Sequence, residues 1–140
     1  MHPSASVLVA SRDGTYARYL VERLRSMGME AAHWIPPGGG NQAEPDLSSV
    51  DVLLVETDGF RDPEWTLVER VRERSPLLEI IAISSDPNVE TAVEVLRSGV
   101  FSVVSYPVSD DQLAEVILEA CRRKRHGEER LKFLGRTPCK

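Results

Sequence analysis

The stretch Asp51-Val52-Leu53-Leu54-Val55-Glu56 decides the fold class of this chain. Four consecutive apolar residues between two acids indicate a strand that is buried on both faces, which is typical of the central strands of a parallel sheet. Gly59 and Pro63 break the chain soon after it. Because sites in open α/β sheets form at the carboxyl ends of the strands, Glu56 is predicted to lie at or beside any site.

Strands and helices are predicted to alternate on both sides of this stretch. Short apolar runs indicate strands at residues 6–10, 30–35, 78–83 and 100–104, and apolar residues at helical spacing indicate helices within residues 16–27, 63–75, 89–98 and 109–120. The proline and glycine residues of segment 36–45 exclude a helical ladder, so the helix between the second and third strands is expected to be short or missing. This order predicts an α/β fold with a doubly wound, five-stranded parallel sheet.

The charge of the chain is unevenly distributed. Residues 1–120 hold 9 arginines and 20 acidic residues, a net charge of −11, whereas residues 121–140 hold 8 basic and 2 acidic residues, a net charge of +6. All three lysines, Lys124, Lys132 and Lys140, lie in this basic tail. An acidic body argues against nucleic-acid binding by the body itself.

Several features favour a cytoplasmic protein with one compact domain. No apolar run approaches the roughly 18–20 residues of a membrane span, and the first residues lack the pattern of a signal peptide. Cys121 and Cys139 fit no metal or redox spacing. The expected division is a domain at 1–121 followed by a basic helical extension or linker at 122–140.

The tail permits three interpretations. It can be a solvated helix extension that frays after Gly127, or a linker helix to a dimer partner or an output domain, since apolar residues at heptad spacing continue to Leu134. Gly127 interrupts that apolar seam. It can also be a nucleic-acid-binding arm, although the four consecutive basic residues Arg122 to Arg125 lack interleaved aromatic residues.

The order of elements and the residues at the strand ends resemble the receiver domain of bacterial response regulators, the CheY-like fold, from about Ser6 to Ala120. The segment Val89 to Phe101 looks like the family's fourth helix and the glycine that precedes its fifth strand. The stretch Asp51 to Glu56 is similar to the strand that ends in the phosphoacceptor aspartate. The resemblance implies a CheY-like, flavodoxin-like sheet and a role in two-component phosphorelay signal transduction.

The resemblance also implies a phosphorylation site at the strand ends, and several of its positions are substituted here. A working receiver uses two acids for Mg²⁺, a phosphoacceptor aspartate, a hydroxyl residue, and a lysine followed by proline. The matching positions hold, in that order, Ser11 and Arg12, Glu56, Ser84, Tyr106 and Pro107. Asp13 lies one place after the acid pair.

These substitutions predict a pseudo-receiver with no catalytic residue, no metal ligand and no cofactor. Mg²⁺ requires an octahedron of oxygen ligands, whereas Arg12 puts a fixed positive charge at a ligand position. Glu56 is longer than aspartate by a methylene, which misplaces an attacking oxygen for in-line phosphoryl transfer. The chain is therefore expected not to be an enzyme.

Alternative roles for these residues stay open. Glu56 can form a structural ion pair with Arg12, or it can imitate a phosphorylated aspartate. In a third alternative, Glu56 or a nearby acid is itself phosphorylated. In that last case the receiver could form the N-terminal part of a transcriptional regulator. A flavodoxin-like phosphate or FMN site in the turn Ser11 to Thr15 is a remote alternative, because the turn has one glycine and Asp13 would repel phosphate.

In the receiver family, dimerisation and output use the face made by the fourth helix, the fifth strand and the fifth helix. The resemblance implies self-association, or contact with a signalling partner, through that face, extended by the tail. The residues expected there are Val89, Val93, Leu96, Phe101, Val103, Leu113 and Ile117. The predicted function is a signalling module that works by protein–protein contact.

Overall fold

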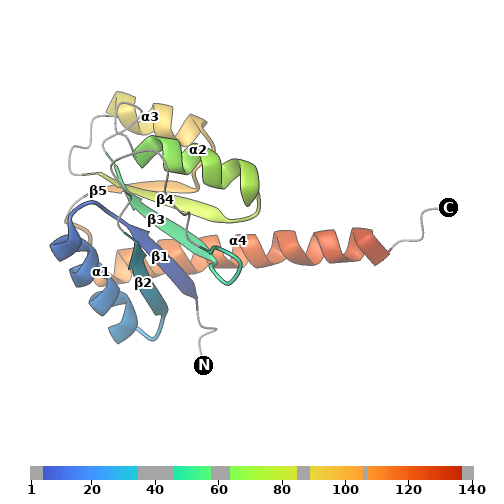
Figure 1. Ribbon diagram of the computed structural model, residues 1–140, viewed down its shortest axis with the longest axis horizontal. Helices are drawn as coiled ribbons and strands as arrows, with labels where there is room; N and C mark the ends of the chain where they lie inside the picture. Colours follow the sequence, from blue (N-terminus) through green and yellow to red (C-terminus); the bar gives the residue numbers. More distant parts are fainter. Residues whose placement is uncertain (1–4, 35–45, 58–63, 85–88, 106, 137–140) are drawn as a thin grey trace.

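Five strands and four helices make up the part of the chain that the computed structural model describes, residues 5–34, 46–57, 64–84, 89–105 and 107–136 (Figure 1). The strands are β1 (Ser6–Ala10), β2 (Glu30–Trp34), β3 (Val52–Glu56), β4 (Glu79–Ser84) and β5 (Ser102–Ser105). The helices are α1 (Gly14–Ser26), α2 (Glu64–Arg74), α3 (Val89–Arg97) and α4 (Asp110–Arg136).

The strands form one parallel sheet in the order β2-β1-β3-β4-β5. The strand quoted at the outset, β3, lies at its centre, with Val52 to Val55 fully buried. A central parallel strand is covered on both faces, which is why its apolar residues are consecutive and not alternating. The predicted five-stranded, doubly wound α/β fold is confirmed.

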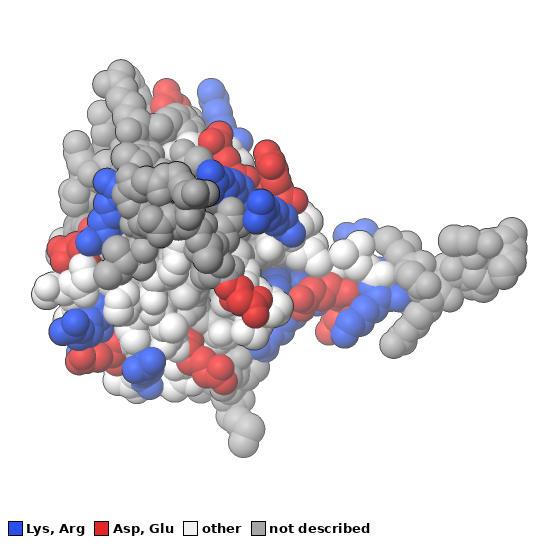
Figure 2. Space-filling model, viewed as in Figure 1, with Lys and Arg blue, Asp and Glu red and all other residues white. Residues whose placement is uncertain are grey.

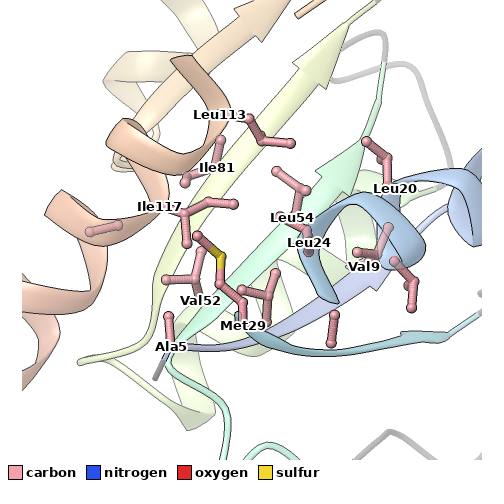
Figure 3. Close-up of a cluster of buried hydrophobic side chains, with 14 of the residues drawn as sticks. Ala5, Val9, Leu20, Leu24, Met29, Val52, Leu54, Ile81, Leu113 and Ile117 are labelled. Carbon is pink, nitrogen blue, oxygen red and sulfur yellow. The ribbon is translucent and has the colours of Figure 1, made fainter. Parts of the chain in front are cut away.

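The helices cover both faces of the sheet, α1 and α4 on one face and α2 and α3 on the other (Figure 1). Each face has its own apolar cluster, because successive side chains of a strand point to opposite faces. Leu54 and Ile81 pack with Leu20 and Leu24 of α1 and with Ile117 of α4 in the first cluster (Figure 3). The second cluster joins Leu53, Val55 and Ile80 to Trp65, Val68 and Val71 of α2 and Val95 of α3.

The predicted boundaries of most elements differ from the observed ones by one or two residues. The strand predicted at 100–104 is observed at Ser102–Ser105, and the one predicted at 78–83 at Glu79–Ser84. Most of the segment predicted to have a short or missing helix, residues 36–45, lies outside the described residues. The described remainder, 46–51, contains a turn and no helix.

The last helix corrects one expectation about the tail. One of the three interpretations had the helix fray after Gly127, but α4 continues through this residue to Arg136. A Cβ atom at Gly127 would lie 3.1 Å from Cδ2 of Leu77, in the connection between α2 and β4. The helix thus passes close to the body of the domain at Gly127, where a side chain would require Leu77 to shift by a few tenths of an ångström.

Candidate functional site

The strand register brings three of the predicted site residues to one edge of the sheet. In the β1–β3 pair Ala10 is opposite Val55, so the residues that follow, Ser11 and Glu56, are also neighbours. Ser84 ends the adjacent strand β4, where it follows the residue opposite Glu56. This edge contains the carboxyl ends of the strands, where sites form in doubly wound folds.

Ser11 and Glu56 are joined directly. The Ser11 hydroxyl, which is fully buried, donates a hydrogen bond to Oε1 of Glu56 and accepts one from the backbone N–H of Asp13 at 3.0 Å. Glu56 itself is half-buried, and Arg12 is exposed. The contact predicted between Arg12 and Glu56 stays a prediction, while the contact with Ser11 is one that sequence reasoning missed.

Asp13 has a structural task at this edge. Its Oδ1 accepts hydrogen bonds from the backbone N–H groups of Thr15 at 3.0 Å and Tyr16 at 3.2 Å, which caps the N-terminus of α1. The carboxylate also places negative charge at the positive end of the helix. The two amides that a bound phosphate would use at this helix N-terminus are therefore occupied, which disfavours the remote phosphate or FMN alternative.

The remaining predicted site residues differ in their burial. Ser84 is buried and Pro107 is exposed, while Tyr106 lies outside the described residues. Among the residues placed in the structure, no group of three or more His, Cys, Asp or Glu side chains is arranged to hold a metal ion. Within the same part of the chain, no helix is both long and apolar enough to cross a membrane.

The residues predicted for an interface differ in exposure. Val93 and Leu96 on α3 are exposed, at 40% and 46%. Phe101 and Val103 are half-buried, and the side chain of Val89 lies outside the described ones. The choice of Leu113 and Ile117 was wrong: they are 2% and 0% exposed and belong to the apolar cluster between α4 and the sheet.

A second polar cluster lies at the opposite, amino edge of the sheet, where the sequence had indicated no site. Asp51, directly before β3, is 9% exposed. Its Oδ2 accepts a hydrogen bond from the backbone N–H of Ser6 at 2.9 Å and one from Arg125 at 3.2 Å, and Oδ1 lies 3.4 Å from Nζ of Lys124. Lys124, itself buried, also pairs with Glu128 at 3.0 Å.

The Asp51 carboxylate is ionised in this cluster. Burial is the largest single influence on its pKa and acts to raise it, but the Ser6 amide and the charges of Arg125 and Lys124 together outweigh burial and lower the pKa below its ordinary value. Nearby, burial first and the Asp51 charge second raise the pKa of the Cys121 thiol. Cys121 is therefore a buried, protonated thiol.

A neighbouring ion pair extends the cluster to β4. Nε of Arg123 lies 3.1 Å from Oε2 of Glu79, and the Arg123 guanidinium stands over the ring of Phe101 at 5.7 Å from its centroid. Burial raises the pKa of Glu79, and the charges of Arg123 and Arg72 partly oppose this effect. Three of the four consecutive basic residues of the tail thus contact the body of the domain.

A sequence signal for this cluster existed. Asp51 stands immediately before β3 and Glu79 is the first residue of β4, so both carboxylates belong to the amino edge of the sheet. The basic run begins one residue after Cys121, at the end of the inward-facing part of α4. Acids at an edge and bases at the end of the covering helix favour ion pairs.

The fold matches solved receiver domains over most of the chain. A response-regulator receiver domain from Clostridium thermocellum superposes with a TM-score of 0.70 at 18% identity, covering 86% of this chain and 97% of that one. NtrX from Brucella abortus, solved in complex with ADP, covers 99% of this chain with a TM-score of 0.74 at 19% identity. The chain has the receiver fold of the response regulators.

Sequence comparison connects this chain to longer regulators. It is 25% identical to the DNA-binding transcriptional regulator NtrC of Azospirillum brasilense over 96% of its own length and 30% of the relative's. It is 31% identical to a putative NtrX-like response regulator of Rickettsia conorii over 56% of its length, which is 16% of that relative. The chain therefore spans less than a third of the length of these relatives. No protein-family model matches the chain.

Proposed function

We propose that this chain is a receiver module of the two-component class that has lost phosphoacceptor chemistry and signals by protein–protein contact in the cytoplasm. The observation that carries the proposal is the hydrogen bond from the buried Ser11 hydroxyl to Glu56. In a working receiver, as the resemblance implies, these two positions hold a metal-binding acid and the phosphoacceptor aspartate. Here one of the two carboxylates is replaced by a hydroxyl that binds the other.

The donors at this edge fit Mg²⁺ poorly. Oδ1 of Asp13 is used to cap α1, and Oε1 of Glu56 accepts from Ser11. Arg12 adds a guanidinium where the resemblance implies a ligand, and a hard divalent cation is held chiefly by carboxylate oxygens. An incoming phosphoryl group would thus lack the metal that neutralises its charge.

The first prediction is that the protein gains no phosphoryl group when it is incubated with acetyl phosphate and millimolar Mg²⁺, as read by mass spectrometry of the intact chain. A quadruple variant, Ser11→Asp and Arg12→Asp with Glu56→Asp and Tyr106→Lys, restores the residues of the resemblance and serves as the matched control. A mass gain of one phosphoryl group in the natural sequence, absent in Glu56→Gln, would contradict the proposal. It would favour the alternative of a live receiver that uses Glu56.

The second part of the proposal is a standing interface on α3, extended by α4. Val93 and Leu96 lie on the same side of α3 at a spacing of three residues and are exposed. Leu131, on the projecting part of α4, is 55% exposed and continues the apolar spacing of the helix. A receiver that cannot be phosphorylated has no chemical means of switching an interface on and off, so an interface that is always present is the simpler arrangement.

The second prediction is that this receiver forms a dimer whose dissociation constant rises at least about tenfold in Leu96→Glu, because the substitution puts a charge in an apolar contact. Sedimentation equilibrium measures the constant. Glu94→Gln, on the same helix and also exposed, is the control and is expected to change it little. A natural sequence that remains monomeric at high micromolar concentration would exclude this interface.

A second candidate role follows from the NtrC relative, whose printed name describes a DNA-binding transcriptional regulator. We propose that the receiver passes its signal to an output domain of that kind, in the same chain or in a partner. The match to NtrX over 99% of this chain includes α4, which supports a linking role for the helix. The body of this receiver, with its net acidic charge, does not contact the nucleic acid in this proposal.

A further inference from the structure

The last helix leaves the domain as a projecting arm. We define the arm as residues 122–136 of α4, which extend beyond the sheet and end away from it (Figure 1). Basic and acidic residues are interspersed along its exposed surface (Figure 2). The exposure of Leu131 shows that this part of the arm stands clear of the body.

All the described ion pairs between the arm and the body fall within one turn. Arg123 pairs with Glu79, and Lys124 and Arg125 pair with Asp51. Just beyond them, the absence of a side chain at Gly127 lets the helix pass against Leu77. We call these contacts together the clamp.

The Asp51–Lys124 pair at the centre of the clamp is shielded from solvent. The side chains of Asp51 and Lys124 are 13% and 10% exposed, so ions in solution screen their attraction weakly. Two cations face one carboxylate, and the same carboxylate holds the backbone of Ser6 at the start of β1. Asp51 therefore joins three elements: β1, β3 and the arm.

We propose that Asp51 anchors the arm to the sheet, so that the arm and the domain move as one rigid unit. The arm continues a helix that is already packed on the sheet through Leu113 and Ile117, so no new nucleus has to form. The clamp holds the start of the arm on the body, which opposes fraying of the residues that follow as far as Arg136. This inference concerns the edge opposite Glu56 and does not depend on whether the receiver is phosphorylated.

Hydrogen exchange of the whole chain, read residue by residue by NMR, tests the anchor. In Asp51→Asn the backbone N–H groups of the arm should exchange about tenfold faster. The uncharged side chain of the asparagine can still accept a hydrogen bond from the backbone N–H of Ser6, but it no longer attracts the charges of Lys124 and Arg125. The amides of α1 and β4 should change by a smaller factor. Glu129→Gln, an exposed residue of the arm, removes one negative charge and is the matched control, expected to leave the rates unchanged.

Two results would overturn the anchor. One is an arm whose exchange in Asp51→Asn equals that of the natural sequence. The other is an equal increase in all elements, which would mean that Asp51 supports the whole fold and not the arm. If Asp51→Asn fails to fold, the double variant Lys124→Gln with Arg125→Gln removes the partners from the arm side, and the same two criteria apply to it.

Discussion

Ile117→Ala should lower the free energy of unfolding by about 3 kcal/mol, within the range for large-to-small changes in a closed core. Ile117 is completely buried between α4 and the sheet, where it packs with residues such as Leu54 and Ile81 (Figure 3). Removing three carbon atoms there loses apolar burial and leaves a cavity that close-packed neighbours fill only in part. Urea denaturation followed by circular dichroism measures the loss.

This result separates a core residue from an interface residue. Leu96→Ala, at an exposed position of α3, is the control and should change the free energy of unfolding of the monomer by less than about 0.5 kcal/mol. If Ile117→Ala instead left the unfolding midpoint unchanged and weakened self-association, the assignment of Ile117 to the core would be wrong, and the interface expected from the sequence would stand.

The second expected result concerns the site. Ser11→Ala should lower the free energy of unfolding by about 1–2 kcal/mol, because it removes a donor from a half-buried carboxylate and an acceptor from the N–H of Asp13. Ser26→Ala, an exposed serine with a local hydrogen bond to Arg23, is the control and should cost less. Urea unfolding of the same preparations gives both values.

A double-mutant cycle identifies the partner of Ser11. Combining Ser11→Ala with Glu56→Ala should give a coupling free energy of about 1 kcal/mol, since each single change removes the same hydrogen bond. The corresponding cycle of Arg12→Ala with Glu56→Ala should give a smaller coupling, because Arg12 is exposed and exposed ion pairs contribute little. Zero coupling between Ser11 and Glu56 would require another account of the site.

The sheet was predictable because its signals are local. Each strand is a short apolar run between residues that break regular structure, and the run at Val52 to Val55 could belong only to a strand covered on both faces. The alternation of such runs with helical spacing then fixes a parallel sheet. The predicted boundaries of the strands differ from the observed ones by a residue or two, because hydrogen bonding and not composition sets the ends of a strand.

The tail was the least predictable part, because distant residues determine it. Glycine has a low helix propensity, so one interpretation had the helix fray after Gly127, yet α4 continues, and at this residue it passes close to Leu77. Lys124 and Asp51 are 73 residues apart in sequence. A run of basic residues looks like a solvated tail until the fold places acids beside it.

The candidate site was predicted in position but not in detail. The resemblance identified Ser11, Glu56 and Ser84, and the strand register places all three at one edge. The partner of Glu56 was sought by charge, which favoured Arg12. The strand register shows a further partner: the residue that follows Ala10 on β1 is the neighbour of Glu56, and that residue is the uncharged Ser11. The contact of Glu56 with Arg12 stays a prediction.

Gly127 also divides the arm into two parts of unequal length. From Gly127 to Arg136 the helix rises by about 14 Å, whereas from Arg123 to Gly127 it rises by about 6 Å. The contacts with the sheet therefore hold the shorter part of the arm, and the longer part is its free end. In an arm that moves with the domain as one rigid unit, a small rotation of the domain displaces Arg136 farther than it displaces the anchored residues, because Arg136 lies farther from the sheet.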